Sequence, residues 1–329
     1  MASPAQARAW LDGERASLVA VAAHTATQGS PGHTTRLAAT MFRYLETGGY
    51  YADAVTIHSQ AKNAACLLGD RAAEATALTN LGIISWRQGR YRQAVGYHKQ
   101  ALAASVEIGD KAGEAIAVAN LGVVYERQGR YEQSASCHQQ ALVLFRETDD
   151  RSGTARGLAN LGSVAARQGH YGQAVGWYQQ ALDQFRDIGD RIGEASALPD
   201  LGIAYQRQGR YEQAIGCYKQ ALALFGESGD RTGEAEARNG VGEILLSTRR
   251  PEEARVEHTA ALTLASQIGD TYEQARAHSG LSAALHAIGD VDLARHHGRR
   301  ARDLYSELGV PDEQKHRDLE HVIVGHSTF

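Results

Sequence analysis

The sequence has 329 residues, of which 43% are hydrophobic and 22% are charged, and its formal net charge is −4. These values are typical of a soluble globular or repeat protein, and the weakly acidic balance gives no electrostatic support for binding nucleic acid or anionic lipid. Proline is rare, whereas alanine, glutamine, arginine and leucine are plentiful, which favours helix throughout. No apolar run approaches the roughly 20 residues of a membrane-spanning helix. We therefore expect an all-α, cytoplasmic protein.

The first segment, residues 1–31, is predicted to be helical and to precede the regular part of the chain. Its apolar stretch "ASLVAVAA" looks like the core of a short signal peptide. However, Asp12 and Glu14 come before it, where a signal peptide carries basic residues. This supports the expectation of a cytoplasmic protein.

From residue 32 to residue 309 the sequence repeats with a period of forty residues. "NLGIISWRQGRYRQA" begins at Asn80 and "NLGVVYERQGRYEQS" at Asn120. A Gly-Asp pair is expected to end one helix and cap the next, and a Gln-Gly turn to separate the two helices of a unit. This parsing predicts seven helix pairs, at about residues 33–68, 72–108, 112–148, 152–188, 192–228, 232–268 and 272–308. A C-terminal helix and tail are expected at residues 310–329.

Small residues mark the surface on which the two helices of a unit should meet. One stripe of the first helix consists of Leu78, Leu81, Gly82 and Ser85. The matching stripe of the second helix consists of Ala94, His98, Ala101 and Leu102. The glycine and the alanines should allow a close approach. The end units are less regular, as expected where units cap a stack.

The pattern N-L-G-x-x-Y-x-R-Q-G-R-Y-x-Q-A, followed by an Ala-Leu pair, resembles the tetratricopeptide repeat (TPR) over about residues 33–308. The long period is similar to that of kinesin light chains and LGN-type adaptors. The resemblance implies a right-handed superhelix, or α-solenoid, with an N-terminal helix and a C-terminal capping helix. It also implies that first helices line a concave groove and that no closed active-site cavity exists.

The stretch "ARAWLDGERASLVAVAAHTA" is similar to the segment that enters the repeats of large actinobacterial transcription regulators of the SARP/STAND type, such as AfsR. Those proteins also carry repeats of the "GDRxGEAxALxNLGxxYxxxGRY" kind. The chain has no G-x-x-x-x-G-K-[ST] motif and no DNA-binding helix pattern, so nucleotide and DNA binding do not carry over. The resemblance implies either the sensor end of such a regulator or a standalone relative.

Two polar positions recur as regularly as the core does. At 100° per residue, Asn120 and Arg127 lie on the same side of the first helix, opposite the core stripe, with Val123 beside them. Repetition predicts a groove lined by two polar ladders and an apolar floor. The ladders are Asn80, Asn120, Asn160 and Asp200, and Arg87, Arg127, Arg167 and Arg207. The floor is Ile83, Val123 and Ile203, with Ser163 interrupting it.

The chemistry of the ladders suggests what they would bind. An asparagine amide both donates and accepts, so a row of them could hold the main chain of a ligand, whereas arginine would select carboxylate or phosphate groups. The resemblance implies peptide contacts for Asn80, Asn120 and Asn160, and Asp200 departs from that pattern. In the alternative, structural interpretation, the asparagines bond between first helices and the arginines pair with acidic turns.

Two single residues and the sixth unit add further expectations. Trp86 is either an aromatic anchor for a ligand or a packing residue. Pro199 either bends its helix beside the groove or is a tolerated irregularity. In the sixth unit Gly240, Glu243 and Ser247 replace the asparagine, the aliphatic residue and the arginine. The ladders end there, so the site is expected to span only residues 72–228.

Other candidate sites are weaker. The three cysteines fit no metal spacing and are expected to be free thiols. His58, His98, His138 and His258 recur at the repeat period, with Tyr178 and Tyr218 in the same place, and are expected to pack between helices. No catalytic motif occurs. We therefore predict no metal, no cofactor and no enzymatic activity.

These observations predict a non-catalytic, protein- or peptide-binding scaffold. It would be the sensor or regulatory interaction domain of a bacterial transcriptional regulator, and its ligand would lie in the concave groove. Other domains of a larger regulator are further candidate partners, and direct contact with nucleic acid or membrane is not expected. The alternatives left open are a self-association module that forms oligomers, and a small-molecule-binding protein or enzyme that uses the superhelix as a cavity.

Overall fold

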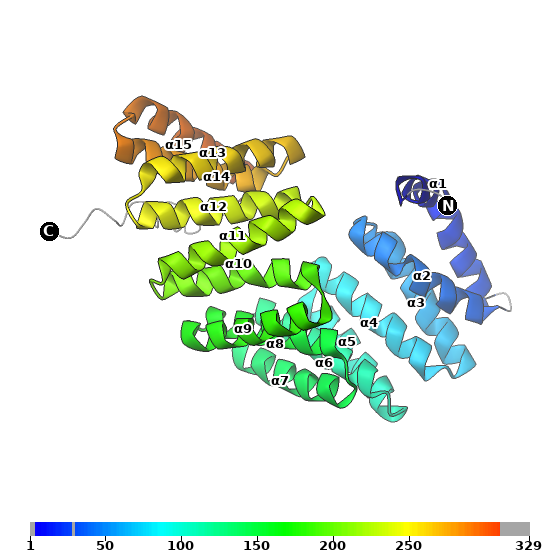
Figure 1. Ribbon diagram of the computed structural model, residues 1–329. Coiled ribbons are helices and arrows are strands. Elements are labelled where there is room, and N and C mark those ends of the chain that lie inside the picture. Colours follow the sequence, from blue (N-terminus) through cyan, green and yellow to red (C-terminus); the bar gives the residue numbers. More distant parts are fainter. Residues whose placement is uncertain (1–3, 28–29, 310–329) are drawn as a thin grey trace. The chain divides into compact units, whose positions relative to one another are not determined.

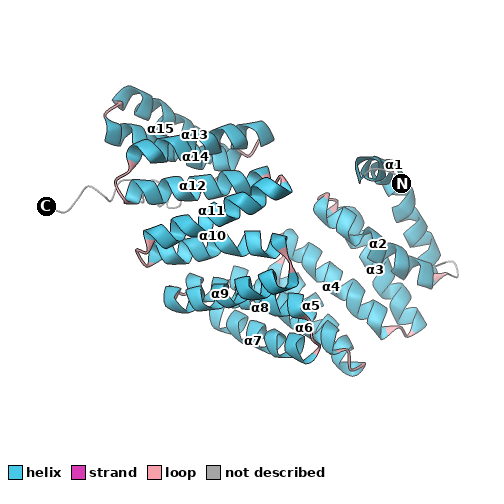
Figure 2. Ribbon diagram, in the orientation of Figure 1, coloured by secondary structure: helices cyan, strands magenta, loops and turns pink. Residues whose placement is uncertain are grey.

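The computed structural model describes residues 4–27 and 30–309, and this part of the chain consists of α-helices joined by short turns (Figures 1 and 2). It contains fifteen helices and no strand, so the all-α prediction is confirmed for these residues. The C-terminal helix and tail expected at residues 310–329 lie outside the described residues. No helix in the described ranges has the length and apolarity that crossing a membrane requires.

Most helices are 17 or 18 residues long and most connections are short. Their bounds are α1 (Pro4–Thr27), α2 (Pro31–Thr47), α3 (Tyr51–Leu68), α4 (Arg71–Arg87), α5 (Tyr91–Glu107), α6 (Lys111–Arg127), α7 (Tyr131–Glu147), α8 (Arg151–Arg167), α9 (Tyr171–Ile188), α10 (Arg191–Arg207), α11 (Tyr211–Ser228), α12 (Arg231–Ser247), α13 (Pro251–Ile268), α14 (Thr271–Ile288) and α15 (Val291–Glu307).

The Gly-Asp pairs act as the sequence predicted. Gly69 ends α3 in the left-handed conformation, at φ 66°, and the Asp70 carboxylate accepts a hydrogen bond from the Ala73 amide at 2.9 Å. A left-handed residue closes the C-terminus, and an acceptor satisfies an N-terminal amide that has no partner within the helix. Two of the turns lack glycine at the left-handed position, which is taken by Asp149, at φ 53°, and Arg249, at φ 59°.

Backbone contacts divide the chain into two compact units, residues 1–164 and 165–329. In unit 1 the first helices of successive pairs contact one another, α2 with α4 and α4 with α6. In unit 2 the same holds for α10 with α12 and α12 with α14. We call the solvent-facing side of these first helices the inner face. It carries Asn80, Ile83, Asn120 and Val123 in unit 1, and Asp200, Ile203, Glu236 and Glu243 in unit 2.

The two helices of a pair meet where the sequence predicted. A Cβ atom added at Gly122 would lie 2.6 Å from His138 Cε1, and one added at Gly82 would lie 2.4 Å from His98 Cε1. The glycine of the first helix therefore makes a slot that the ring of the second helix fills. Four buried histidines occupy this repeat position, and burial lowers the pKa of each to about 4: His58, His98, His138 and His258.

Candidate functional site

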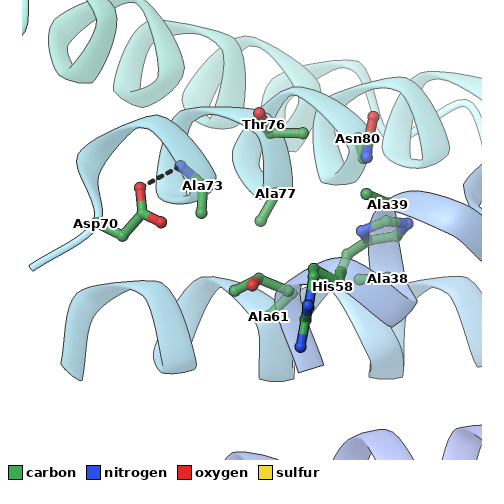
Figure 3. Close-up of a pocket in the computed structure, with 11 residues that line it drawn as sticks. Ala38, Ala39, His58, Ala61, Asp70, Ala73, Thr76, Ala77 and Asn80 are labelled. Atoms are coloured by element: carbon green, nitrogen blue, oxygen red, sulfur yellow. Dashed lines mark hydrogen bonds between the residues drawn. The ribbon is translucent and has the colours of Figure 1, made fainter. Parts of the chain in front are cut away.

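The asparagine ladder begins beside a cavity in unit 1. Asn80, on α4, is 8% exposed and lines a cavity of about 290 Å³. Ala77 lies one turn before it, and His58 and Ala61 of α3 line the same cavity (Figure 3). The other lining residues are Thr35, Arg36, Ala38 and Ala39 of α2, and Asp70, Ala73 and Thr76 at the start of α4. Five of the eleven lining residues are alanine and the others are polar or charged, so the amide of Asn80 lies in a mixed apolar and polar wall.

The ladder asparagines of unit 1 make no hydrogen bonds to the fold. The Nδ2 atom of Asn120 is buried and has no acceptor. The side chains of Asn80 and Asn160 likewise form no hydrogen bond with the described residues. The structural interpretation required bonds between neighbouring first helices, and the described part of unit 1 contains none at these positions. A buried amide donor without an acceptor is costly, so a ligand that supplies the acceptor would gain free energy.

The first residue of the arginine ladder, Arg87, bonds to another part of the fold, unlike the ladder asparagines. Arg87 donates to Glu46 of α2, from Nε at 2.8 Å and from Nη2 at 2.6 Å. Its guanidinium also lies 4.9 Å from the centre of the Trp86 ring. Arg87 and Trp86 therefore contact each other, and Arg87 ties α4 to the end of α2, as the structural interpretation predicted for the arginines. Arg127, in contrast, is exposed and has no partner within the described residues.

The remaining predicted positions lie on the same faces. Ile83 and Val123 are half-buried floor residues on α4 and α6. Ser163 of α8 donates to Glu126 of α6 at 2.8 Å, so the polar interruption of the floor joins two first helices. Arg167 and Arg207 are exposed at the ends of α8 and α10.

The helix that carries Asp200 is continuous. α10 runs from Arg191 to Arg207 across Pro199, which is buried, whereas Asp200 is exposed on the inner face of unit 2. Proline is accommodated here without ending the helix. Ile203, also exposed, follows on the same side of α10.

The inner face of unit 2 is hollowed by a pocket of about 400 Å³ that we call the unit 2 pocket. It contains the predicted residues Ile203 and Arg207, and also Glu243 and Ser247, which the sequence analysis placed beyond the end of the site. The full lining is Ile203, Gln206 and Arg207 of α10, Tyr211 and Tyr218 of α11, Glu236, Glu243 and Ser247 of α12, and Tyr272 and Arg276 of α14. The inner face therefore stays available as a candidate site past the ladders, with a different chemistry.

An asparagine that sequence reasoning missed explains why the ladder stops. Asn239 lies one position before the ladder position and is fully buried. Its Nδ2 donates to Glu273 Oε2 at 2.9 Å, and its Oδ1 lies 2.9 Å from His258 Nδ1. The shift by one residue turns the amide from the inner face into the core, where it links α12, α13 and α14. The signal was present in the sequence, because residues 239–242 read "NGVG" where residues 119–122 read "ANLG".

Arg276 forms ion pairs with two carboxylates at the unit 2 pocket. Its Nη2 donates to Glu243 Oε1 at 2.7 Å, and its Nη1 donates to Glu273 Oε1 at 3.1 Å. Two carboxylates thus surround one guanidinium, and they hold the pKa of Arg276 well above its usual range despite burial, which acts the other way. Among the residues that the structure describes, no group of three or more histidine, cysteine, aspartate or glutamate side chains is placed to hold a metal ion.

Comparisons with solved structures agree with this architecture. A STAND protein with a tetratricopeptide repeat sensor from Pyrococcus horikoshii is 15% identical, with a TM-score of 0.65, over 94% of this chain and 49% of that one. The apo form of RapI is 12% identical, with a TM-score of 0.65, over 84% and 99%. A Rap protein complexed with competence and sporulation factor is 14% identical, with a TM-score of 0.57, over 95% and 98%. At these identities the likeness shows the fold alone.

Sequence comparison identifies the family. No curated protein matches the sequence. Family models described as tetratricopeptide repeat match residues 77–112, 114–187, 159–227, 193–264 and 233–307. These matches extend over most of the chain. The chain belongs to the tetratricopeptide repeat family.

Proposed function

We propose that this protein is a non-catalytic scaffold that binds an extended peptide, or an extended segment of a partner protein, on the inner faces of its first helices. We further propose that it is the sensor or regulatory domain of a bacterial transcriptional regulator. The observation that carries the proposal is the buried, unpartnered Nδ2 of Asn120, which repeats the position of the unbonded Asn80 forty residues before it.

The spacing of these amides fits a peptide main chain. Packed helices lie about 8–10 Å apart, and an extended chain advances about 3.3–3.6 Å per residue, so amides on neighbouring first helices would meet the main chain about every third residue. An amide contacts the main chain whatever the ligand's side chains are. Ile83 and Val123 would then contact apolar side chains of the ligand, and Arg127 is available for an acidic group.

The comparisons support this proposal by analogy. One solved protein of the same fold is complexed with competence and sporulation factor, and another carries its repeats as the sensor of a STAND protein. The chain spans 49% of the length of that STAND protein, as expected if it corresponds to a sensor region. On the inner face, the amide nitrogen of Asn120 is buried and has no partner.

The experiment selects peptides from a displayed library of random linear sequences and compares the native protein with the Asn80→Ala/Asn120→Ala variant. Each lost hydrogen bond is worth about 1 kcal/mol, so the double variant should bind selected peptides roughly tenfold to thirtyfold more weakly. Its melting temperature should be unchanged, because neither amide bonds to the fold. Asn63→Ala, an exposed asparagine on α3, is the matched control and should leave binding intact.

Two results would contradict the proposal. Undiminished binding by the double variant would show that the ladder is not the contact surface. A large fall in its melting temperature, with binding that follows the loss of folded protein, would show that the asparagines stabilise the stack instead.

A further inference from the structure

The unit 2 pocket has a hydroxyl group at its base that comes from an outer helix. Tyr218, on α11, is 4% exposed and still lines the pocket. Its ring passes between Gly202 of α10 and Gly240 of α12. A Cβ atom added at Gly240 would lie 2.6 Å from Tyr218 Cζ and 2.9 Å from its oxygen, and one added at Gly202 would lie 3.0 Å from Cε2. Two glycines on neighbouring first helices thus open a gap through which this hydroxyl reaches the inner face.

The Tyr218 hydroxyl has no hydrogen-bond partner among residues 4–27 and 30–309. Burial raises its pKa well above the usual range, and Glu243 raises it further, so the group is a neutral phenol at ordinary pH. A phenol oxygen both donates and accepts. The hydroxyl belongs to a buried side chain but lines a pocket that a ligand can enter, and no hydrogen bond within the described residues satisfies it.

The charges that act on the hydroxyl are mainly negative. They are Glu243, Arg276, Glu236 and Asp200, and the single cation among them is already bound by the carboxylates of Glu243 and Glu273. Arg207 is a second cation that lines the pocket, at its α10 end. An anion placed on the hydroxyl would face three carboxylates.

Glu236 is the acid without a counter-ion. Its side chain lines the pocket, and it forms neither an ion pair nor a hydrogen bond with the described residues. Water still reaches the carboxyl of Glu236, but partial burial in the pocket raises its pKa. The negative charge of the nearby Glu273 raises the pKa further. The rings of Tyr211 and Tyr272 also line the pocket. Aromatic faces near a carboxylate attract cations.

We propose that the unit 2 pocket binds a basic side chain, lysine or arginine, of the peptide ligand, with Glu236 as the counter-ion and the Tyr218 hydroxyl accepting a hydrogen bond from its N–H. This inference rests on the proposed peptide-binding function and adds the chemistry of the ligand. It differs from the selection of acidic groups that the sequence predicted for the arginine ladder. The unit 2 pocket therefore recognises a charge opposite to the one that Arg127 would select.

The experiment uses the full chain and fluorescein-labelled peptides from the selection described above. Each peptide is made with lysine, arginine, norleucine or glutamate at its basic position, and binding is measured by fluorescence anisotropy. Loss of the charged hydrogen bond should weaken binding of the norleucine peptide about tenfold or more relative to the lysine peptide. Added salt should weaken binding of the lysine and arginine peptides only.

Two variants locate the interaction. Glu236→Gln should remove most of the preference for lysine over norleucine, and Tyr218→Phe should reduce it while leaving the melting temperature unchanged or raised, because no bond within the fold is lost. The controls are Glu212→Gln, an exposed acid at the start of α11, and Tyr178→Phe, forty residues before Tyr218 in the same repeat position. Both controls should keep the preference.

The outcomes separate this inference from the proposed function. If peptides bind through the asparagines with equal affinity for lysine, norleucine and glutamate, only the inference is overturned. If no library peptide binds the native chain, the proposed function fails and the inference fails with it. If the protein binds the free diamine cadaverine as tightly as the lysine peptide, the claim that the cation belongs to a peptide is overturned. A destabilised Tyr218→Phe variant would show that the hydroxyl serves the fold.

Discussion

The buried histidines make the stability of the stack depend on pH between about 4 and 6.5, the ordinary pKa of histidine. Burial lowers the pKa of His138 to about 4, and the same holds for His58, His98 and His258. In this window the unfolded chain binds protons that the folded chain does not. Stability therefore rises with pH across the window, and it is lost as pH falls through it.

The size of the effect follows from the two pKa values of each group. At pH 5 a histidine with a pKa of about 4 when folded and about 6.5 when unfolded costs about 2 kcal/mol of stability, and at pH 7 it costs almost nothing. The effects of separate histidines add where one cooperative unit contains them. Unit 1 contains three of them: His58, His98 and His138.

The assay measures the free energy of unfolding in urea at pH 7, 6 and 5, for the native chain and for His138→Phe. Phenylalanine keeps an aromatic ring in the glycine slot without a titrating group, so the variant should lose about 2 kcal/mol less between pH 7 and pH 5. His286→Gln, an exposed histidine on α14, is the control and should follow the native profile. Identical pH profiles for the native chain and His138→Phe would refute the claim that burial keeps this ring neutral.

Three further substitutions test the packing and the turns. Gly122→Ala should cost about 1–3 kcal/mol more than Gly96→Ala in urea unfolding, because an added Cβ meets the His138 ring at the first site and nothing within 4 Å at the second; equal values would place the ring elsewhere. Arg249→Gly should raise the free energy of unfolding by about 1 kcal/mol by relieving a left-handed residue, at φ 59°; a loss would mean that the Arg249 side chain stabilises the turn. Asn239→Ala should lower the melting temperature, with a cost of about 1–3 kcal/mol, because its partners on α13 and α14 remain buried and unpaired. An unchanged melting temperature would argue against that network.

The fold could be predicted because its determinants are local and repeated. The Gly-Asp pair fixes a helix end and the next helix start within a few residues, and the glycine opposite a ring fixes where the two helices of a unit meet. The seven-residue spacing from Asn120 to Arg127 also predicted that these two residues share one side of α6, and Arg127 is exposed there. None of this needed contacts beyond one unit and its neighbour.

The site could be predicted only in part, because its chemistry depends on residues that break the repeat. Arg87 is bound by Glu46, which belongs to the irregular unit before it, so the repeat pattern did not indicate that this arginine is used by the fold. The unit 2 pocket depends on Gly202 of α10 and Gly240 of α12. These glycines leave a gap that the Tyr218 ring of a third helix, α11, fills. Such a gap exists only once the helices are stacked.

The glycine slot between paired helices also has an evolutionary consequence. The slot accepts imidazole in some units and phenol in others, as His138 and Tyr218 show, and a histidine codon becomes a tyrosine codon by one base change. The phenol is longer, and where the adjoining first helix also has glycine, as at Gly240, its oxygen reaches the inner face. One such mutation can therefore add a hydrogen-bonding group to the ligand surface from the second helix of a pair, while the first helices keep their own sequences.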